Sequence, residues 1–257
     1  MKKPSNLKAV QESFGIQAGG FENGAMSFTK QEYLDYTVAC MEPSSSDSVL
    51  EVAAGTCACG RALAPSVRVV TCLDATPAML EVGKREARSL NNMIFIKGCA
   101  EELPFLDSSF DIVLSRLAFH HFPEVETPFG EMTRVLKPGG KLVLIDMEAA
   151  EESLRSTEDR IEKMRDPSHV RNLSQAEAHR LFATHSLTLE RCEKTAIPVS
   201  LKSWLELTKT PAAVRGDITR RMRAELEEGF KTGFAPYRQG AEIFFRQTWM
   251  LLIGRKP

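Results

Sequence analysis

Residues 49–64, with the sequence VLEVAAGTCACGRALA, decide the fold of this chain. The apolar run at 49–52 is typical of a buried strand, and residues 61–64 favour a helix. Residues 53–57 between them are all small, so a large flat ligand can approach the backbone there. Because the N-terminus of the following helix lies behind this turn, we expect a negative charge or a hydrogen-bond acceptor to bind here.

An acid follows the next apolar run at the spacing that nucleotide-binding units use. Residues 67–73 predict a second strand, and Asp74 lies 23 residues after Glu51. In nucleotide-binding βαβ units, an acid about 20 residues further on hydrogen-bonds to the ribose. The sequence therefore predicts that Asp74 binds a ribose. The alternative is that Asp74 only caps the helix that begins at Pro77.

Four later segments follow in the order typical of one known family. They are residues 98–105 (GCAEELPF), 110–115 (FDIVLS), 118–122 (AFHHF) and 134–142 (RVLKPGGKL). Together with the first two strands they resemble the class I S-adenosylmethionine (SAM) dependent methyltransferases. The branch with the most similar pattern contains the quinone-biosynthesis C-methyltransferases and many small-molecule methyltransferases. The resemblance implies the fold and SAM as cofactor, but it says little about the substrate, because one fold hosts many chemistries.

Strands that alternate with helices predict an α/β, Rossmann-like, doubly wound and mostly parallel sheet. Seven strands are expected, at residues 49–53, 67–73, 93–97, 110–115, 140–147, 186–195 and 242–254. Helices are expected at residues 29–41, 58–64, 77–89, 124–136, 151–164 and 174–183, and two or three more between 200 and 234. The resemblance implies that the last strand inserts antiparallel beside residues 186–195.

The same pattern divides the chain into a core and helical lids. Residues 1–42 are expected to be an N-terminal helical lid segment, and 43–199 the SAM-binding Rossmann-like core with a helical insertion at 151–183. Residues 200–240 are expected to be a helical substrate lid, and 241–257 the final antiparallel strand. The segment FGIQA that begins at Phe14 resembles one that precedes the first helix in the quinone branch, which implies a lid over the cofactor. The alternative is a floppy terminus whose aromatic residues pack on the domain.

Composition and charge limit the partners that this chain is expected to bind. Its 257 residues carry 33 Lys and Arg against 34 Asp and Glu, so nothing predicts a nucleic-acid surface. No apolar run reaches the roughly 18 residues of a membrane span, and no apolar segment follows the N-terminal charges. We therefore expect a cytoplasmic monomer or homodimer with free thiols at its six cysteines.

The resemblance implies which residues contact SAM. Asp74 would accept both ribose hydroxyls, Glu51 would meet the amino group, and Gly55 would face the methionine part. The full predicted set is Glu51, Ala53, Ala54, Gly55, Asp74, Ala75, Met79, Cys99, Ala100, Glu101, Ser115 and Arg116. Two departures from the family pattern stand out. Ala53 and Cys57 replace two of the three glycines of the turn, and Cys99 replaces the acid that usually accepts the adenine amino group.

Fewer features of the sequence point to the site that binds the methyl acceptor. His120 and His121 follow the fourth strand and His169 lies in the loop DPSHVRN, so each is a candidate general base, or a histidine that only packs and bonds to backbone. The predicted substrate-binding residues are Phe14, Arg171, Trp204 and Tyr237. No metal is expected. Methyl transfer by in-line displacement needs none, and the pair Cys57 and Cys59 has no second ligand pair at suitable spacing.

The sequence thus predicts a SAM-dependent methyltransferase that acts on a small molecule, with S-adenosylhomocysteine as product. O- or C-methylation of an aromatic or quinone-like acceptor is expected, because the motif N/D-P-P-Y/F of adenine N-methyltransferases is absent after the fourth strand. Three alternatives remain: a protein or tRNA methyltransferase, a SAM-binding protein without activity, and an NAD-dependent dehydrogenase. Release of S-adenosylhomocysteine with an acceptor would separate the enzyme from the inactive binder.

Overall fold

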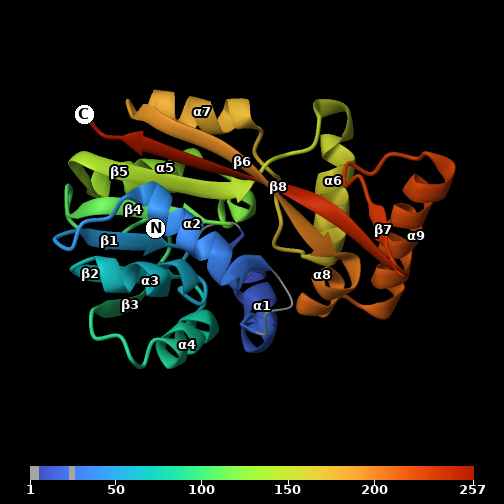
Figure 1. The fold of residues 1–257 in the computed structure, drawn as a ribbon, viewed down its shortest axis with the longest axis horizontal. Coiled ribbons are helices and arrows are strands. Elements are labelled where there is room, and N and C mark those ends of the chain that lie inside the picture. Colours follow the sequence, from blue (N-terminus) through green and yellow to red (C-terminus); the bar gives the residue numbers. More distant parts are fainter. Residues whose placement is uncertain (1–5, 23–26) are drawn as a thin grey trace.

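The computed structural model describes residues 6–22 and 27–257. One mixed sheet runs through the molecule in the order β3-β2-β1-β4-β5-β8-β6, with the short strand β7 paired to β8 (Figure 1). The strands are β1 (Ser48–Val52), β2 (Val69–Asp74), β3 (Met93–Lys97), β4 (Phe110–Arg116), β5 (Leu136–Met147), β6 (Thr188–Ser200), β7 (Tyr237–Gln239) and β8 (Glu242–Arg255). The predicted seven strands are confirmed, and β7 is an addition.

Strand directions follow the prediction as well. The strands β1 to β5 pair in parallel, whereas β8 inserts antiparallel between β5 and β6. All five residues of β1 are buried, as expected for a central strand covered on both faces. The sequence-based ends were less accurate: β6 continues to Ser200 instead of ending at residue 195.

Helices cover both faces of the sheet. They are α1 (Leu7–Gln17), α2 (Gln31–Met41), α3 (Ala58–Leu63), α4 (Pro77–Glu86), α5 (Glu126–Val135), α6 (Glu152–Arg165), α7 (Gln175–Thr184), α8 (Leu201–Leu207) and α9 (Ala212–Glu228). Apolar side chains of α5 and α7 pack on the face that carries Leu50 and Val52. Those of α2, α3 and α4 pack on the face that carries Val49. No described helix is long and apolar enough to cross a membrane.

A second apolar core lies where β6 and β8 extend beyond the parallel strands, against α6, α8 and α9 (Figure 1). Trp204 of α8 is fully buried there and meets Phe245 edge-on, with 5.1 Å between the ring centroids. Pro211 precedes α9 and separates it from α8. A capping box begins α7, because the Ser174 hydroxyl accepts from the Glu177 N–H while the Glu177 carboxylate accepts from the Ser174 N–H. This second core builds one wall of the cavity described next.

Candidate active site

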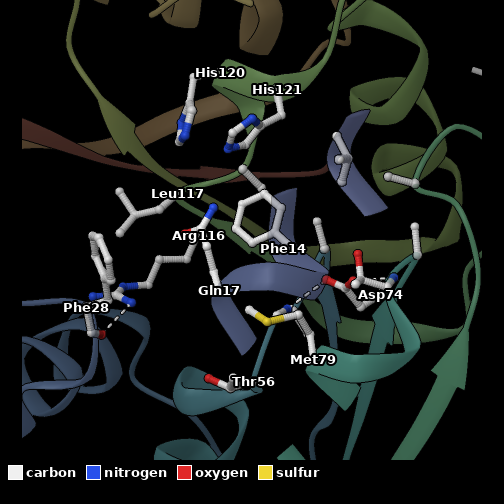
Figure 2. A pocket seen from close by; sticks show the side chains of 18 of the residues that line it. Phe14, Gln17, Phe28, Thr56, Asp74, Met79, Arg116, Leu117, His120 and His121 are labelled. Atoms are coloured by element: carbon white, nitrogen blue, oxygen red, sulfur yellow. Dashed lines mark hydrogen bonds between the residues drawn. The ribbon is translucent and has the colours of Figure 1, made fainter. Parts of the chain in front are cut away.

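A cavity of about 150 Å³ opens at the carboxyl ends of β1, β2 and β4. Helix α1, the turn η4 (Phe119–His121), the end of α6 and α8 enclose its other side. Figure 2 shows Asp74 and Met79 at one end of this space and the two adjacent histidines at the other, with Phe14 of α1 between them. This position matches the general rule that ligands of open α/β sheets bind outside the carboxyl ends of the strands.

The turn after β1 keeps the left-handed backbone of a glycine turn although two glycines are replaced. Ala53, Gly55 and Cys57 have φ values of 53°, 54° and 60°. Left-handed backbone at a residue with a side chain costs about 1–2 kcal/mol, so the surroundings must hold it in place. Cys57 is fully buried, and its thiol lies so close to Gly83 that a Cβ there would approach the Sγ to 2.9 Å. The substitution at Cys57 therefore leaves the turn geometry intact.

Asp74 ties the turn after β1 to the turn after β2. Its Oδ2 accepts from the Gly55 N–H at 2.8 Å, and its Oδ1 accepts from the Thr76 N–H at 2.7 Å. Burial raises the pKa of Asp74, and the two backbone N–H groups oppose that shift. Each carboxylate oxygen has a second lone pair, and the side chain lines the cavity. Capping of the Thr76 backbone and binding of a ligand are thus compatible.

Arg116, at the end of β4, supplies unpaired donors to the same end of the cavity. Its Nη1 donates to the Phe28 carbonyl at 2.9 Å (Figure 2). The guanidinium also lies over the Trp249 ring, 5.1 Å from its centroid. Its Nε and Nη2 are buried and have no partner among the described residues. Because an unsatisfied buried donor costs about 1–3 kcal/mol, and more when charged, these atoms fit an anionic ligand group. The donor set therefore suits a carboxylate.

Glu51, on β1, is a buried acid beside Arg116. Its Oε2 accepts from the Gly60 N–H at 2.8 Å, and Cys72 lies 3.6 Å from the same oxygen. Burial raises the pKa of Glu51 to about 7, and the Gly60 N–H and Arg116 oppose this. A cation that binds next to Glu51 would therefore favour its ionised form near neutral pH.

The other residues predicted to contact the cofactor divide into two groups. Those whose side chain or backbone lines the cavity are Ala53, Ala54, Ala75, Met79, Ala100 and Glu101. Cys99 and Ser115 do not line it. Cys99 forms a bridge with Glu102 next to the cavity, and Ser115 is fully buried within β4. The residues Thr56 and Gln17, which also line the cavity, were assigned no role from sequence.

The three candidate histidines differ in their environment. His120 lines the cavity, and its Nδ1 lies 2.6 Å from Asp146 Oδ1. His121 also lines it, and its Nδ1 meets the Ser168 hydroxyl at 3.1 Å. Burial lowers the pKa of His121 to about 3, and His120 adds to this effect. His169 is 1% exposed and its Nε2 lies 2.9 Å from Asp159, so the structure places it outside the cavity.

Side-chain hydrogen bonds hold helix α1 in place over the cavity. The Ser13 hydroxyl and the Gln17 amide donate to Asp166, at 2.8 Å and 3.2 Å. The Gln11 amide donates to the Ala75 carbonyl at 2.8 Å, which joins α1 to the turn after β2. Phe14 projects between these contacts and meets the His121 ring edge-on, with 5.0 Å between the centroids (Figure 2).

The structure brings only two of the four predicted substrate residues to the cavity. Phe14 and Trp204 line it. Arg171 instead pairs with Glu177 at 2.8 Å, and Tyr237 lies on β7 under the guanidinium of Arg246, at 4.6 Å. Among the further lining residues that were not predicted are Leu117, Arg165, Asp166 and Gln247.

Comparison with known proteins identifies the family. A methyltransferase domain family matches residues 50–144. The uncharacterized methyltransferase YcgJ of Bacillus subtilis is 35% identical over 233 residues, which cover 89% of this chain and 92% of that protein. Its crystal structure has a TM-score of 0.80 and covers 88% of this chain and 98% of that one, at 31% identity. A putative methyltransferase of Bacillus halodurans gives a TM-score of 0.81 at 26% identity, over 88% and 99% of the two chains.

A partial match concerns a protein with a named activity. The demethylmenaquinone methyltransferase of Clavibacter sepedonicus is 36% identical over 110 residues, which cover 43% of this chain and 45% of that protein. The match with YcgJ, in contrast, extends over nearly the whole of both chains. The chain belongs to the class I SAM-dependent methyltransferases.

Proposed function

We propose that the cavity binds SAM, with its adenosine toward Asp74 and its methionine part toward Arg116 and Glu51. The observation that carries this proposal is the buried guanidinium of Arg116, whose Nε and Nη2 lack partners among the described residues. A carboxylate placed there would satisfy both donors, and a bidentate pair of this kind is a strong interaction. The sulfonium of SAM would then lie between the strand ends and the histidines, and it supplies the methyl group.

Each end of the proposed cofactor has a suitable partner. The free lone pairs of Asp74 accept ribose hydroxyls, while the Glu51 carboxylate meets the amino group next to the carboxylate. Met79 lines the cavity and offers an apolar surface to the adenine. Glu101 also lines it, and its carboxylate supplies the acceptor that Cys99 lacks for the adenine amino group.

We further propose a small, largely apolar acceptor that is O- or C-methylated. The acceptor end of the cavity, the part near His120 and His121, is enclosed by α1 and α8 and lined by the rings of Phe14 and Trp204, so a flat molecule fits better than a protein side chain or a tRNA. The partial similarity to a demethylmenaquinone methyltransferase supports a quinol-like ring. By this account α1 and the segment around α8 act as lids, and the active unit is a monomer or homodimer.

Calorimetric titration with SAM and S-adenosylhomocysteine tests the cofactor proposal. We expect micromolar binding to the wild type and at least a tenfold loss, or about 1.4 kcal/mol, in Asp74→Ala. Asp107→Ala is the matched control, since Asp107 is an exposed acid outside the cavity. Absence of binding to the wild type, or equal binding by Asp74→Ala, would contradict the proposal.

A further inference from the structure

We propose that His120, held by Asp146, takes a proton from a hydroxyl group of the acceptor, and that the acceptor is a phenol or an enol with a second oxygen. This inference rests on the proposed function, because a base at this position matters only beside a bound methyl donor. It deepens that function by naming the base and the substrate class.

The geometry fixes the orientation of His120. Asp146 lies in β5, and its oxygens also accept from the N–H groups of Phe119 at 2.6 Å and Met147 at 2.7 Å, so the carboxylate cannot rotate away. With Nδ1–H donating to Asp146 Oδ1 at 2.6 Å, Nε2 carries the lone pair and has no hydrogen-bond partner among the described residues. Figure 2 shows that the His120 ring projects into the cavity above Leu117. A carboxylate that holds one ring nitrogen while the other faces the reacting group is the arrangement that a general base needs.

The charged groups around His120 favour its role as proton acceptor. Asp146 faces it from β5, and Glu162 and Asp166 face it from α6 and the following loop. The neighbouring rings are His121 at 4.1 Å and His169 at 5.7 Å between centroids, and Arg165 lines the same cavity. Burial alone would lower the pKa of His120, but Asp146 and the two further acids raise it above its ordinary value.

Neither of the other histidines has this arrangement. His121 faces the cavity, but its Nδ1 meets a hydroxyl instead of a carboxylate, and burial holds its pKa at about 3. A base of such low pKa retains almost no affinity for the proton of a hydroxyl group. His169 is held by an acid, yet it lies outside the cavity. Of the histidines predicted to be catalytic, only His120 is both held by a carboxylate and in the cavity.

Two further side chains that line the cavity carry hydrogen-bond donors, Trp204 and Arg165. The Nε1–H of Trp204 is buried without a partner among the described residues, and Trp204 lines the cavity. The guanidinium of Arg165 lies over the same indole at 4.5 Å. An oxygen of the acceptor would satisfy the indole N–H, whereas an ammonium group has no lone pair to offer it. The walls thus suit a ring that presents one hydroxyl to His120 and a second oxygen to Trp204.

The proposed step balances without an oxidant or a reductant. The hydroxyl proton moves to Nε2 of His120, and the electron pair left on oxygen forms the bond to the methyl carbon as the carbon–sulfur pair stays on sulfur. In C-methylation the same pair is delocalised to a ring carbon, which bonds the methyl group and then loses its own proton while the oxygen regains one. In both cases His120 finally returns its proton to water.

A coloured phenol tests this without knowledge of the natural acceptor. We would add para-nitrophenol, and separately the bicyclic para-nitronaphthol, to the complex with S-adenosylhomocysteine and record the phenolate absorbance. At a pH about one unit below the pKa of each free probe, where about a tenth of that probe is ionised, we expect more than half of the bound probe to be ionised, because His120 holds the proton in the complex. His120→Ala should bind the probe without this ionisation, and added imidazole should restore it. Asp146→Asn should reduce it.

The matched control is His185→Ala, because His185 pairs with Glu126 on the surface and lies outside the cavity. It should ionise the probe as the wild type does. If His120→Ala does not fold, His120→Gln replaces it, and nitrogen NMR of the wild-type complex with S-adenosylhomocysteine alone, at a pH above the raised pKa of His120, must show the His120 proton on Nδ1.

Equal ionisation in the His120 variant would overturn the inference, as would binding of the neutral phenol by the wild type or failure of the complex to bind either probe. Failure of the proposed function is seen separately, in the prior titration, as absence of S-adenosylhomocysteine binding. That result would remove the methyl donor and this inference with it.

Discussion

The two ends of the cavity are built in different ways. At the cofactor end, Gly55, Asp74 and Arg116 follow the ends of three neighbouring parallel strands and are held mainly by backbone N–H and C=O groups. At the acceptor end, Phe14 and Trp204 come from helices almost 200 residues apart in the chain. The first end depends mainly on the sheet, with one contact to Arg116 from outside it, the Phe28 carbonyl, so the fold specifies most of this end. The second depends on how helices outside the sheet dock, so it can change while the cofactor end is kept.

Among the variants that test whether the two ends of the cavity are separate, the largest effect is expected at His120. With a phenol that the enzyme methylates, His120→Ala should lower kcat by about 10²–10⁴-fold, because positioned proton transfer contributes that much. The affinity for SAM should not change, since His120 belongs to the acceptor end. Release of S-adenosylhomocysteine and a SAM titration measure the two quantities. A parallel loss of SAM affinity would mean that the two ends are not separate.

The pH dependence of kcat tests whether Asp146 raises the pKa of His120. The base must be neutral to accept a proton, so kcat should rise as the pH passes through the raised pKa of His120. Asp146→Asn removes the charge that raises this pKa, and burial then lowers it, so the rise should move to lower pH while kcat itself falls. A purely structural role for Asp146 would lower kcat without moving the profile.

The next largest effect is expected at Arg116. Truncating one partner of a buried, hydrogen-bonded charge pair costs about 2–5 kcal/mol, so Arg116→Met should weaken SAM binding by about 30-fold or more. Arg171→Met is the matched control, because Arg171 pairs with Glu177 outside the cavity. Equal affinities in the wild type and Arg116→Met would place the carboxylate of SAM elsewhere.

A smaller effect concerns the proton on Glu51. Burial raises its pKa to about 7, so below that pH the group is mostly neutral in the free protein. If the amino group of SAM binds beside it, SAM affinity should increase as the pH rises from about 5.5 to about 7, where a growing fraction of the carboxylate is ionised and the amino group, with an ordinary pKa of about 7.7–8.0, still retains its proton. Glu51→Gln should abolish this increase. Titrations at several pH values would show it, and an unchanged slope in the variant would contradict the assignment.

The smallest effect is expected at the capping box of α7, on the sheet face away from α3. Ser174→Ala should lower the free energy of unfolding by about 1 kcal/mol, the usual contribution of an N-cap side chain. Denaturant unfolding measures this. SAM affinity should stay unchanged, because α7 contributes no residue to the cavity; a change would show that the cofactor end depends on more than the strand ends.

The same contrast explains how much of the molecule could be predicted. Asp74 and Gly55 are found from sequence because strand, turn and acid follow each other within a short stretch, and the order of strands then follows from the alternation with helices. The long pairing of β6 with β8 and the short strand β7 were underestimated, since their partners are distant in the chain.

The acceptor end was predicted less completely for the same reason. Arg171 was predicted to bind substrate, but it pairs with Glu177, the residue that also completes the capping box of α7. Arg165 carries no motif, and its place beside Trp204 depends on the docking of α6 against α8. The sequence alone gave no means to choose between His120 and His121, because the carboxylate that distinguishes them lies in another strand.

A crystal structure of the complex with S-adenosylhomocysteine tests the central claim most directly, namely that one cavity has a strand-end site for SAM and a separate helical site for the acceptor. We expect the ribose on Asp74, the carboxylate on Arg116 and the sulfur directed toward His120. A carboxylate that does not contact Arg116, or a sulfur turned away from His120, would contradict it.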